Sequence, residues 1–142
     1  MFNESFTIGI IMLIVMVIIG VALFPSASIA KKIDEKFKLK GRENDVLIYQ
    51  SPHNLASTSS KISNLKRPRD IKGSDNNRFL LYENYIVVLK PRGLNNTDIE
   101  VMRHSRAYNR YRGPIVNYWG GTIRNGSIGR SSSRGGGFGF GK

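Results

Sequence analysis

Few side chains in this sequence could carry chemistry, and the most suggestive are two carboxylates. Asp98 and Glu100 alternate with apolar residues in a stretch that has the pattern of a β-strand, so both point to one face. Such a pair could share a cation. More often, a charged pair on one strand face marks the solvated side of a sheet. We therefore expect both carboxylates to face solvent.

The other candidate residues do not form a catalytic set. His104 precedes Ser105 without a positioned carboxylate in the sequence, and His53 lies where a helix is expected to begin. Asp34 and Glu35 lie among lysines on an expected surface helix. The sequence has no cysteine, which excludes disulfides, thiolate metal sites and a lipid-modified cysteine. We expect a protein that is not an enzyme and that holds no metal and no cofactor.

The charge of the chain is strongly basic and unevenly distributed. There are 22 Lys and Arg against 10 Asp and Glu, a formal net charge of +12. Residues 101–142 contain eight of the basic residues and no acid. A field of this sign favours anionic partners such as acidic phospholipid, nucleic acid or an anionic wall polymer.

The N-terminal residues 1–28 have the composition of a membrane anchor. Residues 6–24 are uncharged and would span about 28 Å as a helix, close to the ~30 Å of a bilayer core. We expect a single transmembrane helix, and the lipid-contacting residues chosen along it are Phe6, Leu13, Val17 and Phe24. Cleavage as a signal peptide stays open, although the positive n-region of such a peptide is missing.

The flanks of this segment predict its orientation. Lysines cluster just after it, whereas only Glu4 is charged before it. The positive-inside rule therefore favours a single-pass membrane protein with its C-terminal domain in the cytoplasm, and an extracytoplasmic domain stays possible.

Residues 29–112 are expected to form one small α+β domain with two helices and an antiparallel β-meander. The pattern predicts helices over 29–37 and 52–65, a strand over 45–50, a hairpin over 78–90 and a strand over 97–102. The first helix has a narrow apolar stripe. It either packs on the domain or lies on a membrane surface, with three residues facing anionic headgroups: Lys31, Lys32 and Lys36.

The domain also resembles a known family. The segments 79–82, 86–88 and 97–101, followed by Tyr108 and Tyr111, are similar to small uncharacterised proteins of Bacillus-type bacteria, catalogued as a domain of unknown function. The resemblance covers about residues 29–112. It implies an N-terminal export or anchor segment, a short α+β domain and a tail rich in Gly, Tyr, Arg and Ser. It implies no activity, cofactor or catalytic residue.

Residues 113–142 are expected to be a disordered basic tail. They contain 10 of the 15 glycines and few large apolar residues, so they cannot offset the entropy of ordering. The arginines expected to contact an anionic surface are Arg124, Arg130 and Arg134. A tail that binds single-stranded nucleic acid or a protein partner, or that is only solvated, stays open.

These features predict a non-enzymatic, single-pass membrane protein whose domain and tail bind an anionic surface or a protein partner near the bilayer. Two alternatives are a membrane-tethered nucleic-acid binder and an accessory subunit of a membrane complex.

Overall fold

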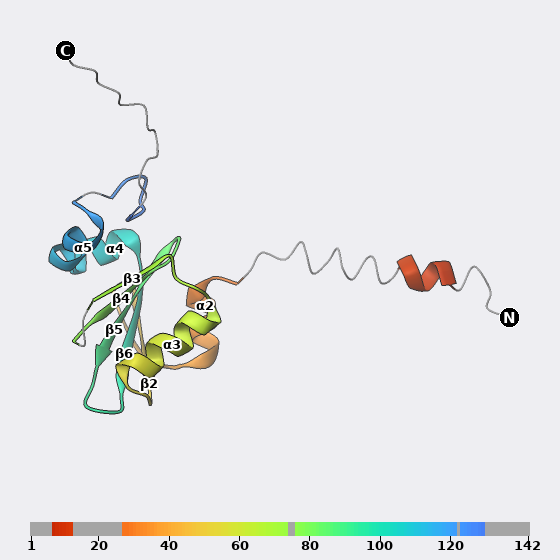
Figure 1. Ribbon diagram of the computed structural model, residues 1–142, viewed down its shortest axis with the longest axis horizontal. Coiled ribbons are helices and arrows are strands. Elements are labelled where there is room, and N and C mark those ends of the chain that lie inside the picture. Colours follow the sequence, from red (N-terminus) through yellow and green to blue (C-terminus); the bar gives the residue numbers. More distant parts are fainter. Residues whose placement is uncertain (1–6, 13–26, 74–75, 122, 130–142) are drawn as a thin grey trace, which may run out of the picture.

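A computed structural model describes residues 7–12, 27–73, 76–121 and 123–129. The domain belongs to the α+β class (Figure 1). Its helices are α2 (Ile29–Lys36), α3 (Leu55–Leu65), α4 (His104–Arg110) and α5 (Arg112–Trp119). Its strands are β1 (Lys38–Glu43), β2 (Val46–Ser51), β3 (Asp70–Gly73), β4 (Arg78–Leu81), β5 (Tyr85–Pro91) and β6 (Thr97–Arg103).

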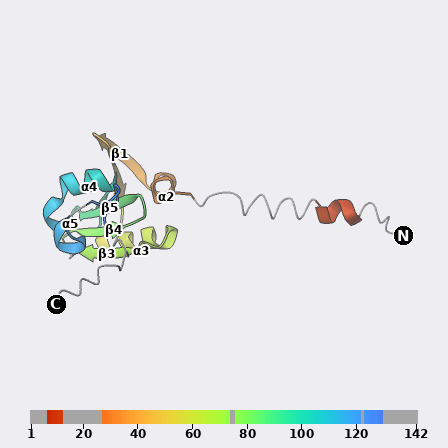
Figure 2. The ribbon, with the colours of Figure 1, turned by 90° about the horizontal axis from the view of Figure 1, so that it is seen from above.

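The six strands form one sheet in the order β1-β2-β6-β5-β4-β3, and every neighbouring pair is antiparallel. Strand β6 thus lies inside the sheet between β2 and β5, although β2 is far from it in the sequence. The two edges are β1 and β3, and Figure 2 shows β1 projecting at one side of the domain.

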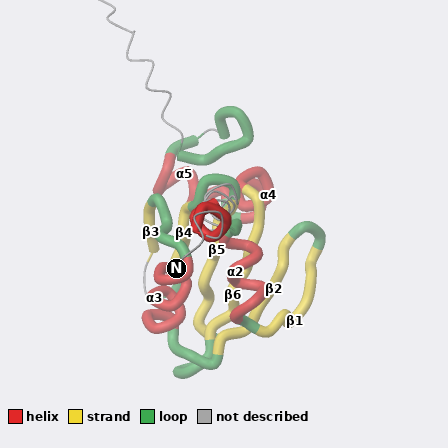
Figure 3. The backbone as a smooth tube through the Cα atoms, turned by 90° about the vertical axis from the view of Figure 1, so that its right-hand side faces the viewer, coloured by secondary structure: helices red, strands yellow, loops and turns green. Residues whose placement is uncertain are grey.

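Helices cover both faces of the sheet, as Figures 1 and 3 show. On one face, α2 and α3 pack over a cluster that includes Val87 and Leu89 of β5. On the other, α4, α5 and the segment after them pack over a cluster that includes Ile86 and Val88. Successive side chains of a strand point to opposite faces of the sheet. Because β5 is covered on both faces, its residues 86–89 are all apolar.

Helix α2 belongs to the core. Ser28 caps it by accepting a hydrogen bond from the Lys31 N–H at 3.3 Å. Ile29 and Ile33 are buried one turn apart in the cluster with α3. The apolar stripe therefore packs on the domain, and the alternative that it lies on a membrane surface is wrong.

The expected fold class is wrong in several respects. The sheet has six strands rather than the expected four, which were one strand and a three-stranded meander, and the domain has four helices rather than two. Strands β1 and β3 were missed because they are the sheet edges. Edge strands carry charge and little apolar alternation, as in the sequences of β1 (KLKGRE) and β3 (DIKG).

The packed structure also continues beyond Arg112, where the sequence predicts a flexible tail to begin. Ile115 of α5 and Ile128 are buried against the sheet. Each of these isoleucines buries a whole side chain, and Tyr118, Trp119 and Ile123 pack against the same cluster. Residues 130–142, which include most of the expected tail, lie outside the described residues.

The predicted single transmembrane helix, and with it the single-pass membrane localisation, is contradicted. Within the described ranges, no helix has both the length and the apolar character needed to cross a bilayer. Residues 13–26, which form most of the expected span, lie outside the described residues. The chosen anchor residues lie outside the described residues: Phe6, Leu13, Val17 and Phe24.

Candidate functional site

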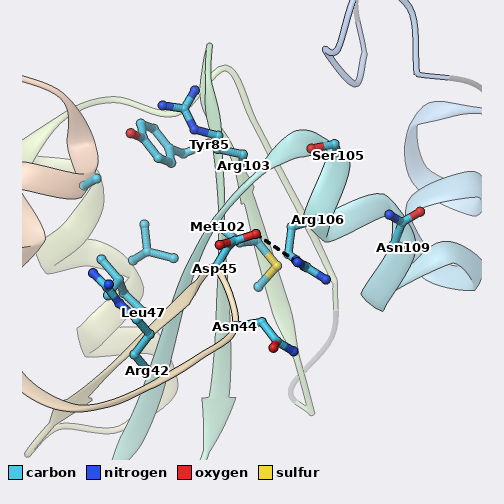
Figure 4. A pocket seen from close by; sticks show the side chains of 12 residues that line it. Arg42, Asn44, Asp45, Leu47, Tyr85, Met102, Arg103, Ser105, Arg106 and Asn109 are labelled. Atoms are coloured by element: carbon cyan, nitrogen blue, oxygen red, sulfur yellow. Dashed lines mark hydrogen bonds and ion pairs between the residues drawn. The ribbon is translucent and has the colours of Figure 1, made fainter.

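A hollow of the domain lies where the β1–β2 turn approaches the junction of β6 and α4. This hollow has a volume of about 550 Å³, and three of its lining residues are arginines: Arg42, Arg103 and Arg106 (Figure 4). We call it the arginine pocket. Its other polar lining side chains are Asn44, Asp45, Tyr85, Ser105 and Asn109.

The three arginines of this pocket differ in their partners. Arg106 donates a hydrogen bond to Asp45 at 2.9 Å, the interaction marked in Figure 4. The guanidinium of Arg103 lies over the Tyr85 ring, 5.5 Å from its centroid. In the described part of the chain, neither Arg42 nor Arg103 forms an ion pair with an acid. The pocket therefore has a positive excess.

Local backbone structure positions these groups. Asn44 in the β1–β2 turn has φ = 53°, a left-handed conformation that Asn tolerates better than most residues. This tight turn brings Asp45 to the start of β2. On the other side, β6 ends at Arg103 and α4 begins immediately, so Arg106 points from the first turn of the helix.

A second hollow, of about 340 Å³, contains the two carboxylates that the sequence singled out. Asp98 and Glu100 are only 4 % and 3 % exposed, so the expectation that they face solvent is wrong. The reason is that β6 lies inside the sheet, with long cationic side chains from neighbouring strands and α4 folded over it.

Both carboxylates form ion pairs with two basic side chains each. Asp98 pairs with Arg92 and with Lys40, the latter at 3.4 Å. Glu100 Oε2 accepts from the Tyr111 hydroxyl at 2.7 Å and lies 2.9 Å from Lys90 Nζ. Its Oε1 lies 2.9 Å from Arg110 Nε but off the line of a hydrogen bond. We call this group of ion pairs the charge network.

The network raises the pKa of both cations that meet Glu100. Burial lowers the pKa of Lys90, but hydrogen bonds to Tyr111 and Glu100 outweigh it, so the pKa stands above its usual value. The pKa of Arg110 is raised first by its hydrogen bond to Glu43 and then by that to Tyr111. The groups stay charged and paired, which makes the network a link between β1, β5, β6 and α4.

His104 is buried and uses both ring nitrogens. Nε2 lies 2.7 Å from the Tyr82 carbonyl oxygen and 3.3 Å from that of Tyr85. Nδ1 accepts a hydrogen bond from the Ile128 N–H at 2.8 Å. This arrangement requires a neutral ring with its proton on Nε2, and it ties the segment around Ile128 to the domain.

Acidification is expected to destabilise the fold through His104. Burial lowers the pKa of His104 in the folded state, and its bonds to the two carbonyls oppose the shift only in part. A lowered folded pKa means that the stabilisation is complete above the unfolded pKa of about 6.5 and is lost as the pH falls through the folded pKa. The free energy of unfolding, measured by urea titration between about pH 7.5 and pH 5.5, should therefore fall at the acid end.

Two histidine variants make this test specific. His104→Gln should flatten the pH dependence over that range, whereas His53→Gln at the start of the α3 region should keep it. A slope that His104→Gln leaves unchanged would assign the effect to other groups.

The described residues contain no group of three or more His, Cys, Asp or Glu side chains that could hold a metal ion. In the second hollow, the only two buried carboxylates are already neutralised by four basic side chains.

The surface residues expected from the sequence are not gathered at either hollow. Lys31 and Lys36 are exposed on α2, and Lys32 donates to the Leu65 carbonyl at 2.9 Å. Arg124 is exposed in the short bridge with Ser127. Arg130 and Arg134 lie outside the described residues.

Sequence reasoning missed the arginine pocket. Arg42 on β1 is about 60 residues from Arg103 at the end of β6 and Arg106 on α4, and no motif connects it to them. The only available signal was the short spacing of Arg103 and Arg106, which by itself indicates no site.

Comparison with known proteins gives one match. A family model described as Domain of unknown function (DUF4247) matches residues 13–140. Neither the curated proteins nor the solved structures contain a match to the chain.

Proposed function

The chain belongs to the DUF4247 family, a domain of unknown function, and from that premise we propose that it is a non-enzymatic module that binds a phosphate-bearing anionic surface. It stays a prediction that this family consists of small membrane-anchored or exported proteins of Bacillus-type bacteria.

The observation that carries the proposal is how the domain uses its acids. Six acidic residues form ion pairs with basic side chains of the same domain: Glu43, Asp45, Asp70, Glu83, Asp98 and Glu100. The chain has only 10 acids for its 22 basic residues, so most of its negative charge is neutralised internally. Exposed basic side chains remain around the domain, among them Lys31, Lys36, Arg42, Arg67, Arg103 and Arg112.

Such a surface has the properties that an anionic partner needs. Each basic residue near an anionic membrane contributes about 1 kcal/mol, and the contributions of several residues add to useful binding. The positive field also raises the rate of encounter with any polyanion.

The side chains best suited to acid–base chemistry are all engaged with other groups of the domain, which supports the non-enzymatic part of the proposal. Asp98 and Glu100 are held in the charge network, and both nitrogens of His104 are engaged with the backbone. A general acid or base must instead reach a substrate proton.

Binding of the full chain to vesicles tests the proposal. At low salt we expect it to sediment with phosphatidylglycerol vesicles and to stay in solution with phosphatidylcholine vesicles. Binding should disappear as salt rises to roughly 0.5 M, because the screening length then falls to a few Å. Inorganic polyphosphate should compete with the vesicles.

Equal binding to both vesicle types, or no binding to anionic vesicles at low salt, would contradict the proposal. A single-stranded DNA oligomer that competes more strongly than polyphosphate of equal charge would favour a nucleic-acid partner instead.

A further inference from the structure

We propose that the arginine pocket is a specific site for a single phosphate group, carried by a free phosphorylated ligand or by a phospholipid headgroup. This inference rests on the proposed function and narrows it to one place. It distinguishes binding at one specific pocket from nonspecific attraction to the positive surface.

The pairing of the cations distinguishes this pocket from the hollow of the charge network. In the charge network, three acids line the wall together with the cations, and the two buried ones are each paired twice. In the arginine pocket, Asp45 is the only acid among the lining residues, against Arg42, Arg103 and Arg106. The basic excess of the lining is two in both hollows, but in the charge network four of the five cations are already held by acids, and the fifth, Arg42, also lines the arginine pocket. Within the described residues Arg42 and Arg103 form no ion pair, so the arginine pocket is where an added anion finds unpaired guanidinium groups.

The donors of the pocket suit a phosphate. A guanidinium presents several N–H groups in a plane, which match two oxygens of a phosphate at once. Figure 4 shows Arg42 and Arg103 on different sides of the Asp45–Arg106 pair, with Asn44 next to Asp45 and Ser105 in the first turn of α4. A phosphate bound to Arg106 would thus lie in a pocket that also holds guanidinium groups from β1 and from the end of β6.

Part of this arrangement is already ordered before any ligand binds. The Tyr85 ring supports the Arg103 guanidinium, whose carbon lies 5.5 Å from the ring centroid. Side chains held in this way lose less conformational entropy on binding. The volume of about 550 Å³ falls within the roughly 300–1,000 Å³ of small-molecule sites.

Asp45 has a distinctive role in this site. Its side chain is 83 % exposed and therefore takes no part in the core. The Asp45 carboxylate forms an ion pair with the Arg106 guanidinium at 2.9 Å. A bound phosphate would replace the Asp45 carboxylate at Arg106. Removal of the carboxylate charge should therefore improve phosphate binding.

The test measures the binding of inorganic pyrophosphate to the full chain by calorimetry. Arg103→Gln and Arg42→Gln are each expected to weaken binding about tenfold, the loss of one charge-assisted contact. Asp45→Asn is expected to strengthen it several-fold, an effect that a folding defect cannot produce. The matched controls are Arg67→Gln and Glu83→Gln, which make the same charge changes outside the pocket and should change affinity less than about twofold.

The same variants on phosphatidylglycerol vesicles distinguish the source of the phosphate. If Arg103→Gln loses binding to both pyrophosphate and phosphatidylglycerol vesicles, the site accepts headgroups as well as free ligands. Loss with pyrophosphate alone supports a site for free ligands.

The inference is overturned if Arg67→Gln weakens pyrophosphate binding as much as Arg103→Gln, or if Asp45→Asn has no more effect than Glu83→Gln. In that case vesicle binding by the wild type would leave the proposed function intact. A wild-type chain that binds neither pyrophosphate nor anionic vesicles would overturn both.

Discussion

Replacing Ile115 by alanine is expected to lower the free energy of unfolding by about 2–5 kcal/mol. The Ile115 side chain is fully buried in the cluster with Phe79, Ile86 and Met102, so its removal leaves a cavity at the α5–sheet interface. A small domain has about 5–15 kcal/mol of stability in total, which makes this a large fraction. Urea unfolding followed by the fluorescence of Trp119, the single tryptophan, measures the effect.

The matched control is Val116→Ala on the same helix. Val116 is 37 % exposed and its truncation should stay within about 0.5 kcal/mol of the wild type. Equal effects of the two substitutions would show that α5 does not pack on the sheet in solution, and the domain would then end near Arg112.

The second large effect is expected from Glu100→Gln, which should cost about 2–3 kcal/mol. The amide keeps the size of the side chain but removes the charge that Lys90, Arg110 and Tyr111 all contact. A fully buried pair would cost more, about 3–5 kcal/mol when one partner is removed. The smaller value follows because Lys90 and Arg110 remain 34 % and 28 % exposed and are partly solvated.

Glu43→Gln is a close control, because Glu43 contacts the same Arg110 at 3.2 Å. Glu43 is exposed, and exposed ion pairs contribute little to stability. Its substitution should therefore change the urea midpoint by an amount near the error of the measurement. If Glu43→Gln costs as much as Glu100→Gln, then burial of the network is not the source of its stabilisation.

Much of the inner sheet could be predicted from the sequence. The expected hairpin over 78–90 is present as β4 and β5, and the expected strands over 45–50 and 97–102 are present as β2 and β6. These segments are rich in β-branched and aromatic residues, and their apolar pattern is strong because the sheet buries it. The edge strands β1 and β3 lack that pattern, since only part of each is covered.

The candidate site was less predictable than the fold. Asp98 and Glu100 were found, but their local spacing could not tell a solvated strand face from a buried one. The difference depends on Lys40, Lys90 and Arg110, which come from other elements.

The sequence by itself determined the basic character of the chain, the lack of cysteine chemistry and the identity of the central strands, because composition and short-range periodicity are local properties. Only the tertiary structure decided that residues up to 129 join the packed domain and that Asp98 and Glu100 are buried. It alone placed Arg42 beside Arg103 and Arg106, because β2 pairs with β6 across about 50 residues of sequence. It also overturned the expected membrane span, since none of the helices in the described segments is long and apolar enough to cross a bilayer.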